Sequence, residues 1–147
     1  MKRFLVAIDG SEGSDAAIDQ ALELAHSPGA QVTFAFVRKP PRSLLGFPYY
    51  ERLLSAELAK ARATIDAALS KAAGKIDARG EVLEGDAVDE ILTFADNSGA
   101  DLIVMGSRGH GAFAGALLGS VSSGVVQHAN VPVLVAKQRP GRNQKAA

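Results

Sequence analysis

The chain of 147 residues has no cysteine and no tryptophan, and aromatic residues make up only 5% of it. Without cysteine, disulfides, thiol catalysis, zinc–thiolate sites and iron–sulfur clusters are excluded. The scarcity of aromatic residues argues against single-stranded nucleic acid as a ligand, because such binding uses aromatic stacking platforms. The formal net charge is zero, so charge gives no reason to expect nucleic acid or an anionic membrane as a partner.

Long hydrophobic runs are also missing. No run approaches the ~18 apolar residues of a membrane span, and the first run stops at Asp9, short of the ~7–15-residue core of a signal peptide. These absences predict a cytoplasmic protein that binds neither nucleic acid nor membrane. The length suits one domain, expected over residues 1–136. Residues 137–147 hold four basic residues and no apolar pattern, which predicts a mobile tail.

Short apolar runs alternate with helical patterns along the chain. Strands are expected at 4–8, 32–37, up to 84, 101–105 and 131–136, and helices at about 14–25, 49–73, 86–95 and 120–129. Ser14 and Asp86 are the expected N-caps of the first and third helices. This β-α order predicts an α/β fold, in which a parallel sheet is covered by helices on both faces as a three-layer sandwich.

Pro132 lies inside the last expected strand. Proline cannot donate to a sheet ladder, so this strand is expected at an edge of the sheet. Its other residues are mostly apolar (Val131, Val133, Leu134 and Val135), and exposed apolar edges tend to pair. We therefore expect a homodimer through residues 131–136 about a two-fold axis. The alternative is that a loop or the tail covers this edge.

The most informative segment runs from Met105 to Ser122, between an apolar run and an expected helix. It contains five glycines, at positions 106, 109, 111, 115 and 119. Glycine lets a ligand approach the backbone closely, and a glycine-rich turn before a helix directs N–H groups and the positive end of the helix dipole at one point. The segment therefore predicts an anion site, most often for phosphate; the alternative is a flexible surface loop.

A doubly wound sheet binds ligands beyond the carboxyl ends of its strands, where the strand order reverses. Asp9 ends the first strand and faces the glycine-rich segment if the two strands are neighbours. Its carboxylate would accept from a sugar hydroxyl or help to hold a metal, or it would only stabilise a turn. The expected phosphate contacts are the backbone near Gly106, Gly109, Gly119 and Ser120, the hydroxyls of Ser120 and Ser122, and the charge of Arg108.

Several familiar motifs are missing. The sequence has no phosphate-binding P-loop, no dinucleotide fingerprint at the first turn (Gly10 to Gly13) and no nucleophile elbow. The three histidines, at 26, 110 and 128, lack metal-ligand spacing. No acid and base stand out as a catalytic pair, so the sequence gives no positive indication of hydrolysis.

Taken together, these residues resemble the ATP-binding branch of the universal stress protein family, over essentially residues 2–136. The branch carries glycine, two residues, glycine, nine residues, and then glycine followed by Ser or Thr. Gly106, Gly109, Gly119 and Ser120 reproduce this spacing. The opening residues 7–11 and the closing residues 131–135 also resemble family hallmarks.

This resemblance implies a five-stranded sheet of order 3-2-1-4-5, an adenine nucleotide alpha-hydrolase-like fold, and a homodimer through the fifth strand. It also implies bound ATP, with or without Mg²⁺, that acts as a switch in the stress response. Ala7, Ile8, Asp9 and the backbone around Val37 would hold the adenosine. The phosphate side would be lined by Met105, Gly106, Arg108, Gly109, Gly119, Ser120, Val121 and Ser122. Two alternatives stay open: a slow ATPase or nucleotidyl transferase in the same crevice, and an interaction module that binds AMP, cyclic AMP or no nucleotide.

Overall fold

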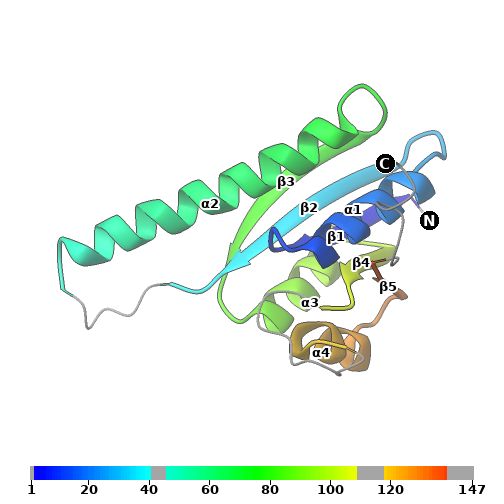
Figure 1. The fold of residues 1–147 in the computed structure, drawn as a ribbon. Coiled ribbons are helices and arrows are strands. Elements are labelled where there is room, and N and C mark those ends of the chain that lie inside the picture. Colours follow the sequence, from blue (N-terminus) through cyan, green and yellow to red (C-terminus); the bar gives the residue numbers. More distant parts are fainter. Residues whose placement is uncertain (1, 41–45, 109–117, 139–147) are drawn as a thin grey trace.

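The computed structural model describes residues 2–40, 46–108 and 118–138. Five strands alternate with four helices in this part of the chain: β1 (Arg3–Ile8), α1 (Glu12–Leu24), β2 (Gln31–Arg38), α2 (Tyr49–Ala72), β3 (Asp77–Glu84), α3 (Ala87–Ser98), β4 (Leu102–Gly106), α4 (Ser120–His128) and β5 (Val133–Ala136) (Figure 1). The strands form one parallel sheet of order β3-β2-β1-β4-β5. The α/β prediction and the implied strand order are confirmed.

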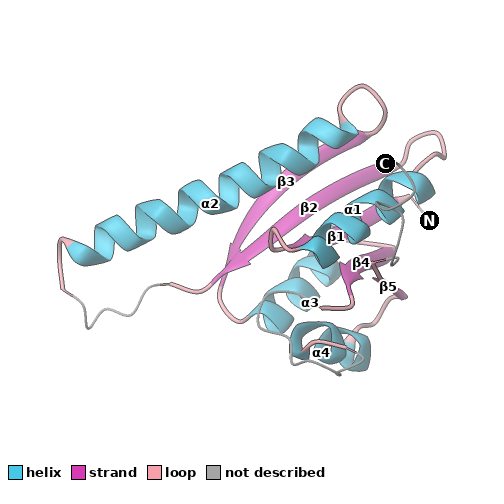
Figure 2. Cartoon of the chain, viewed as in Figure 1, coloured by secondary structure: helices cyan, strands magenta, loops and turns pink. Residues whose placement is uncertain are grey.

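The sheet is the middle of three layers, with α1 and α2 on one face and α3 and α4 on the other (Figure 2). The central strand β1 contributes side chains to both hydrophobic cores. Val6 packs among the residues beneath α1 and α2, whereas Leu5 belongs to the core beneath α3 and α4. Both side chains are at most 1% exposed. Burial on both faces accounts for the continuous apolar run of this strand.

Helix α1 begins earlier than the sequence pattern predicts. Its N-cap is Ser11, whose extended backbone lets the side chain accept a hydrogen bond from the Ser14 amide at 3.2 Å. The prediction that Ser14 caps the helix is wrong, because Ser14 lies within the first turn and is buried. The other predicted N-cap is confirmed: Asp86 accepts from the amide of Asp89 at the start of α3.

The last strand is shorter than predicted. The edge position is confirmed, since β5 pairs only with β4 in the described sheet. However, β5 begins at Val133, so the placement of Pro132 inside the strand is wrong. Pro132 has no N–H to donate, but its carbonyl still accepts from the amide of Ile103 at 3.0 Å. Pro132 therefore accepts a hydrogen bond from β4 but donates none, and regular pairing begins at the next residue.

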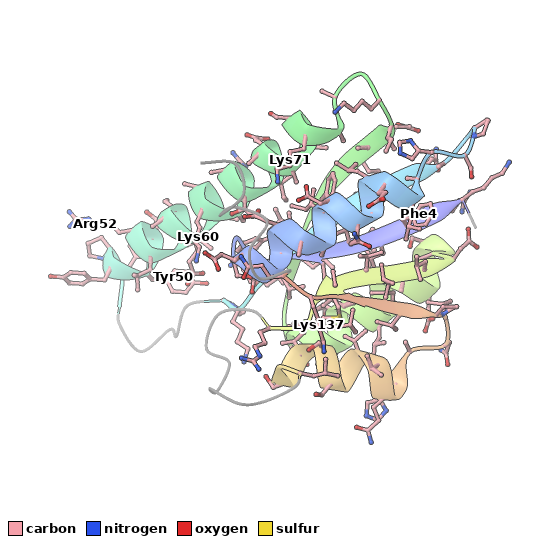
Figure 3. The ribbon with its side chains drawn as sticks, turned by 45° about the vertical axis from the view of Figure 1, so that its right-hand side comes forward. Phe4, Tyr50, Arg52, Lys60, Lys71 and Lys137 are labelled. Atoms are coloured by element: carbon pink, nitrogen blue, oxygen red, sulfur yellow. The ribbon has the colours of Figure 1, made fainter. Side chains whose placement is uncertain are left out.

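Helix α2 extends well past the carboxyl ends of β2 and β3 (Figure 1). Its buried residues, Ala61, Ile65, Ala68 and Ala72, all lie in its second half. Leu54 and Leu58, which the helical pattern also turns inward, are only half-buried because no strand lies beneath the first turns. Figure 3 shows Tyr50 and Arg52 on this projecting part, away from the sheet.

At the other end of the sheet, the Asp101 carboxylate joins the start of β1 to the turn before β4. One oxygen, Oδ2, accepts hydrogen bonds from the Lys2 and Arg3 amides, both at 2.9 Å. These two donors, Lys2 first and then Arg3, lower the pKa of Asp101 below its usual 3.8. The charged carboxylate therefore stabilises the native state.

We expect this contribution to depend on pH. Because the folded-state pKa lies below the unfolded value, the stabilisation is present above about pH 4 and is lost as the pH falls through the folded-state pKa. Asp101→Asn should therefore reduce the free energy of unfolding near neutral pH, and the difference from wild type should shrink as the pH falls below about 4. Urea denaturation across this range measures it; an equal difference at every pH would contradict the role of the charge.

In the part of the chain that the structure describes, no helix is long and apolar enough to cross a membrane. Most of the predicted tail, from residue 139 onward, lies outside the described residues, and its mobility stays a prediction.

Candidate functional site

A cavity of about 150 Å³ opens beyond the carboxyl ends of β1 and β4. It lies where the strand order reverses, since β1 has β2 on one side and β4 on the other. The cavity is lined by Ala7, Ile8, Asp9, Ser11, Ser14, Ala35, Val37, Ala87, Ile91, Met105, Gly106, Arg108, Gly119, Ser120, Val121 and Ser122. Open α/β sheets bind their ligands in this position.

The structure brings together every site residue predicted from the sequence except Gly109, which lies outside the described residues. Five lining residues were missed: Ser11, Ser14, Ala35, Ala87 and Ile91. For two of these residues, the sequence pattern could have indicated a place in the cavity lining. Ala35 lies two positions before Val37 and therefore on the same face of β2, while Ala87 directly follows the predicted N-cap of α3.

The inner wall of the cavity is small and apolar. Ala35 and Met105 come from β2 and β4, the strands on either side of β1, and are buried, and Ile91 of α3 closes the wall from above the sheet. Ala7 and Val37, also on this face, are half-buried. These side chains form an apolar recess beneath α3, suited to an uncharged ring rather than to a charged group.

Asp9 is held at the cavity by the turn that leads into α1. Its Oδ1 accepts a hydrogen bond from the Ser11 amide at 2.9 Å, and its own amide donates to the Ser14 hydroxyl oxygen at 3.0 Å. The turn-stabilising role considered for Asp9 is therefore real. The same hydrogen bonds orient the Asp9 carboxylate, which lines the cavity as a hydrogen-bond acceptor.

The opposite wall is formed by the end of β4 and the start of α4. The Ser107 carbonyl accepts from the Gly119 amide at 2.7 Å and from the Ser122 hydroxyl at 3.0 Å. The sequence predicts that the Gly119 amide and the Ser122 hydroxyl donate to phosphate; in this structure both donors have protein acceptors, and their contact with phosphate stays a prediction. These two hydrogen bonds brace the helix start against β4.

Helix α4 keeps other donors at this wall. The first amides of an α-helix have no acceptor within the helix, and the first i-to-i−4 bond of α4 runs from the Ser123 amide to the Gly119 carbonyl. The amides of Ser120, Val121 and Ser122 precede it, and all three residues line the cavity. Together with the helix dipole, they favour a negatively charged group. The exposed Arg108 adds a positive charge at the same wall.

The two walls meet at a contact between glycines. A Cβ added to Gly106 would lie 2.6 Å from the carbonyl carbon and oxygen of Gly13, and a Cβ on Gly13 would overlap the carbonyl oxygen of Arg108. The opposing atoms belong to the backbone, so no side-chain rotation relieves the clash. This close approach brings the first turn of α1 against the end of β4 and thereby sets the width of the cavity.

Metal-ligand clusters are not found in the described ranges, where no three His, Asp or Glu residues gather around one point. His110 lies outside these ranges, and His26 and His128 are exposed.

The fold and the cavity thus define an α/β protein with a crevice at the topological switch point of its sheet. A model of the universal stress protein family matches residues 1–137. The chain belongs to the universal stress protein family, as its motifs indicated.

Known members resemble the chain over nearly its full length. A universal stress protein of Thermus aquaticus is 35% identical over 137 residues, covering 92% of this chain and 98% of its own. The solved structure of UspA from Lactobacillus plantarum superposes with a TM-score of 0.83 at 27% identity, over 92% of this chain and 97% of its own. A universal stress protein crystallised in complex with cAMP is 30% identical, with a TM-score of 0.68 over 92% and 96% of the two chains.

Proposed function

We propose that the cavity binds an adenine nucleotide and that ATP is its physiological ligand. The observation that carries this proposal is the combination of three features in one cavity: an apolar recess, an oriented carboxylate and the first amides of a helix. These features match the ring, the sugar hydroxyls and the phosphates of a nucleotide in that order. The cAMP complex of a related universal stress protein supports the choice of adenine.

Each part of the nucleotide has a candidate partner. The ring would lie against Ala35, Val37 and Met105, and the Asp9 carboxylate would accept from the ribose hydroxyls. The phosphates would face the amides of Ser120 and Val121, in place of the Gly119 amide that the sequence suggested. If Mg²⁺ accompanies ATP, phosphate oxygens would hold it, with Asp9 as the carboxylate that lines the cavity.

We further propose that the nucleotide acts as a switch rather than as a substrate to be turned over. The ligand would bridge the first turn of α1 and the first turn of α4, two elements on opposite faces of the sheet. A ligand shifts such an arrangement only through its differential affinity for two states. The half-buried, apolar edge of β5 would form a homodimer and so carry this change to a second copy.

Binding is tested by calorimetry and thermal denaturation of the full chain with ATP, AMP and cAMP. A ligand that binds only the native state stabilises it by about 2.7 kcal/mol at a hundredfold excess over Kd. In a domain of this size, this raises Tm by about 5–10 °C. We expect ATP to produce this shift at the lowest concentration, while sedimentation of the same samples reports the dimer.

GTP provides the matched control, because it carries the same sugar and phosphates on a different ring. Equal stabilisation by GTP would contradict the assignment of the recess to adenine. If none of the adenine nucleotides raises Tm or releases heat at millimolar concentration, the proposal fails.

A further inference from the structure

A second hollow, also of about 150 Å³, lies at the opposite end of the sheet, near the N-terminus of the chain (Figure 1). We call it the amino-end hollow. It is lined by Arg3, Phe4, Leu5, Gln31, Thr33, Arg79, Ser98 and Ala100. None of these residues lines the cavity at the carboxyl ends of the strands, so the two sites are separate.

The hollow lies beside the carboxyl end of α3, whose last residue, Ser98, is part of its lining. The helix ends at Ser98, and Gly99 takes the left-handed conformation, with φ at 66°, that terminates it. Beneath this end, Thr33 of β2 is in register with Arg79 of β3. The side chains of Arg3, Thr33 and Arg79 reach the same hollow from three adjacent strands.

The hollow contains two guanidinium groups and no carboxylate among its lining residues. Arg3 donates from Nη1 to the Ser98 carbonyl at 3.1 Å and so satisfies a backbone acceptor at the carboxyl end of α3. Arg79 donates from Nε to the Thr33 hydroxyl, also at 3.1 Å. Neither arginine forms an ion pair with a described carboxylate. Each guanidinium has five N–H donors, so most of their hydrogen-bonding capacity is unused.

The nearest carboxylates are already engaged. Asp77 accepts from the side-chain amide of Gln31 at 3.0 Å, and Asp101 accepts from the two amides at the start of β1. Both acids therefore accept hydrogen bonds from neutral donors, although the charge of Arg3 also acts on the Asp101 carboxylate. Among its lining residues, the hollow has two positive charges and several N–H donors.

We propose that the amino-end hollow binds a phosphate group through Arg79 and Arg3. Guanidinium is planar and presents paired donors that match the oxygens of phosphate, and such charge-assisted bonds are stronger than neutral ones. The Gln31 side-chain amide, which uses one of its two N–H groups on Asp77, adds a neutral donor. The ligand is free inorganic phosphate or a small phosphate monoester, since the surface of the hollow is mostly polar and does not suit the apolar face of a base.

The test uses the Nε–H signals of the arginines in nitrogen-15 NMR spectra of the full chain, titrated at low ionic strength. Inorganic phosphate and glycerol phosphate are added in separate arms, and the tighter ligand identifies the source of the phosphate. We expect saturable shifts of Arg79 and Arg3. Arg79→Gln should weaken binding about tenfold or more, the value of one charge-assisted bond, and Arg79→Lys should lie between this variant and wild type.

Arg62, exposed on α2, is the control within the same spectra. A shift of Arg62 as large as that of Arg79, or shifts that do not saturate, would overturn the site by showing general screening. Gly119→Val, which narrows the nucleotide cavity, should leave the Arg79 titration unchanged. If Gly119→Val abolishes the shift, phosphate binds in the nucleotide cavity and the proposal for the hollow fails, whatever the outcome for ATP.

Discussion

Gly13→Ala is expected to destabilise the protein by about 3 kcal/mol and to lower Tm by about 6–12 °C. The direction of the stability change is what tests the packing, because helix propensity alone predicts the opposite direction. Gly13 lies in the first turn of α1, where replacing glycine by alanine favours an exposed helix by up to about 1 kcal/mol. Here the new methyl would overlap the carbonyl oxygen of Arg108, so α1 has to move away from β4. Urea denaturation measures the effect.

Gly106→Ala should cost a similar amount, because its methyl meets the Gly13 backbone from the other side. The two substitutions act on one contact, so their effects in the double variant should be less than additive. Gly119→Ala is the matched control: among the described residues outside its own chain neighbours, no atom would lie nearer than 3.6 Å to its Cβ. If Gly13→Ala proves neutral or stabilising, the close packing of α1 on β4 is wrong.

Gly119→Val is expected to reduce ATP affinity about 100-fold or more, a loss of at least about 2.7 kcal/mol of binding free energy. Gly119 lines the cavity beside the first amides of α4. An alanine methyl fits at ordinary contact distances, with Ser107, Arg108 and Ser122 as its neighbours. The two further methyls of valine must take space from the phosphate side of the cavity. Calorimetry with ATP measures the change.

Gly119→Ala is again the control, and it should bind ATP within several-fold of wild type. The valine variant should remain folded, since an unfavourable N-cap residue costs only about 1 kcal/mol, and urea denaturation checks this. Full ATP affinity in a folded Gly119→Val protein would refute the placement of the phosphates at α4. That result would not contradict the description of the fold.

The fold was predictable because local signals agreed with one another. The buried strands read as apolar runs, Asp86 marked the start of α3, and Pro132 placed the last strand at an edge. The prediction of the N-cap of α1 was wrong because two residues near the start of this helix can both take the capping position. Ser11 and Ser14 are both good capping residues, and only the packing of Ser14 into the cavity, with its hydroxyl oxygen on the Asp9 amide, decides between them.

The candidate site was predictable in its residues but not in its hydrogen bonds. Glycine spacing indicates where the backbone comes close to a ligand, yet it does not reveal that the Gly119 amide turns to Ser107 instead. The contact between Gly13 and Gly106 joins positions 93 residues apart, and no local pattern reports it. The amino-end hollow was missed for the same reason, since Arg3, Thr33 and Arg79 meet only through strand pairing.

The order β3-β2-β1-β4-β5 places β1, which is translated before the other four strands of this sheet, in its centre. While β4 is still untranslated, β1 can have only β2 as a neighbour, and the edge that will later pair with residues 102–104 is bare. An uncovered apolar edge invites pairing with other chains. Nascent chains released before β4 should therefore be aggregation-prone clients of chaperones, and they should be unable to capture a nucleotide before synthesis has passed α4.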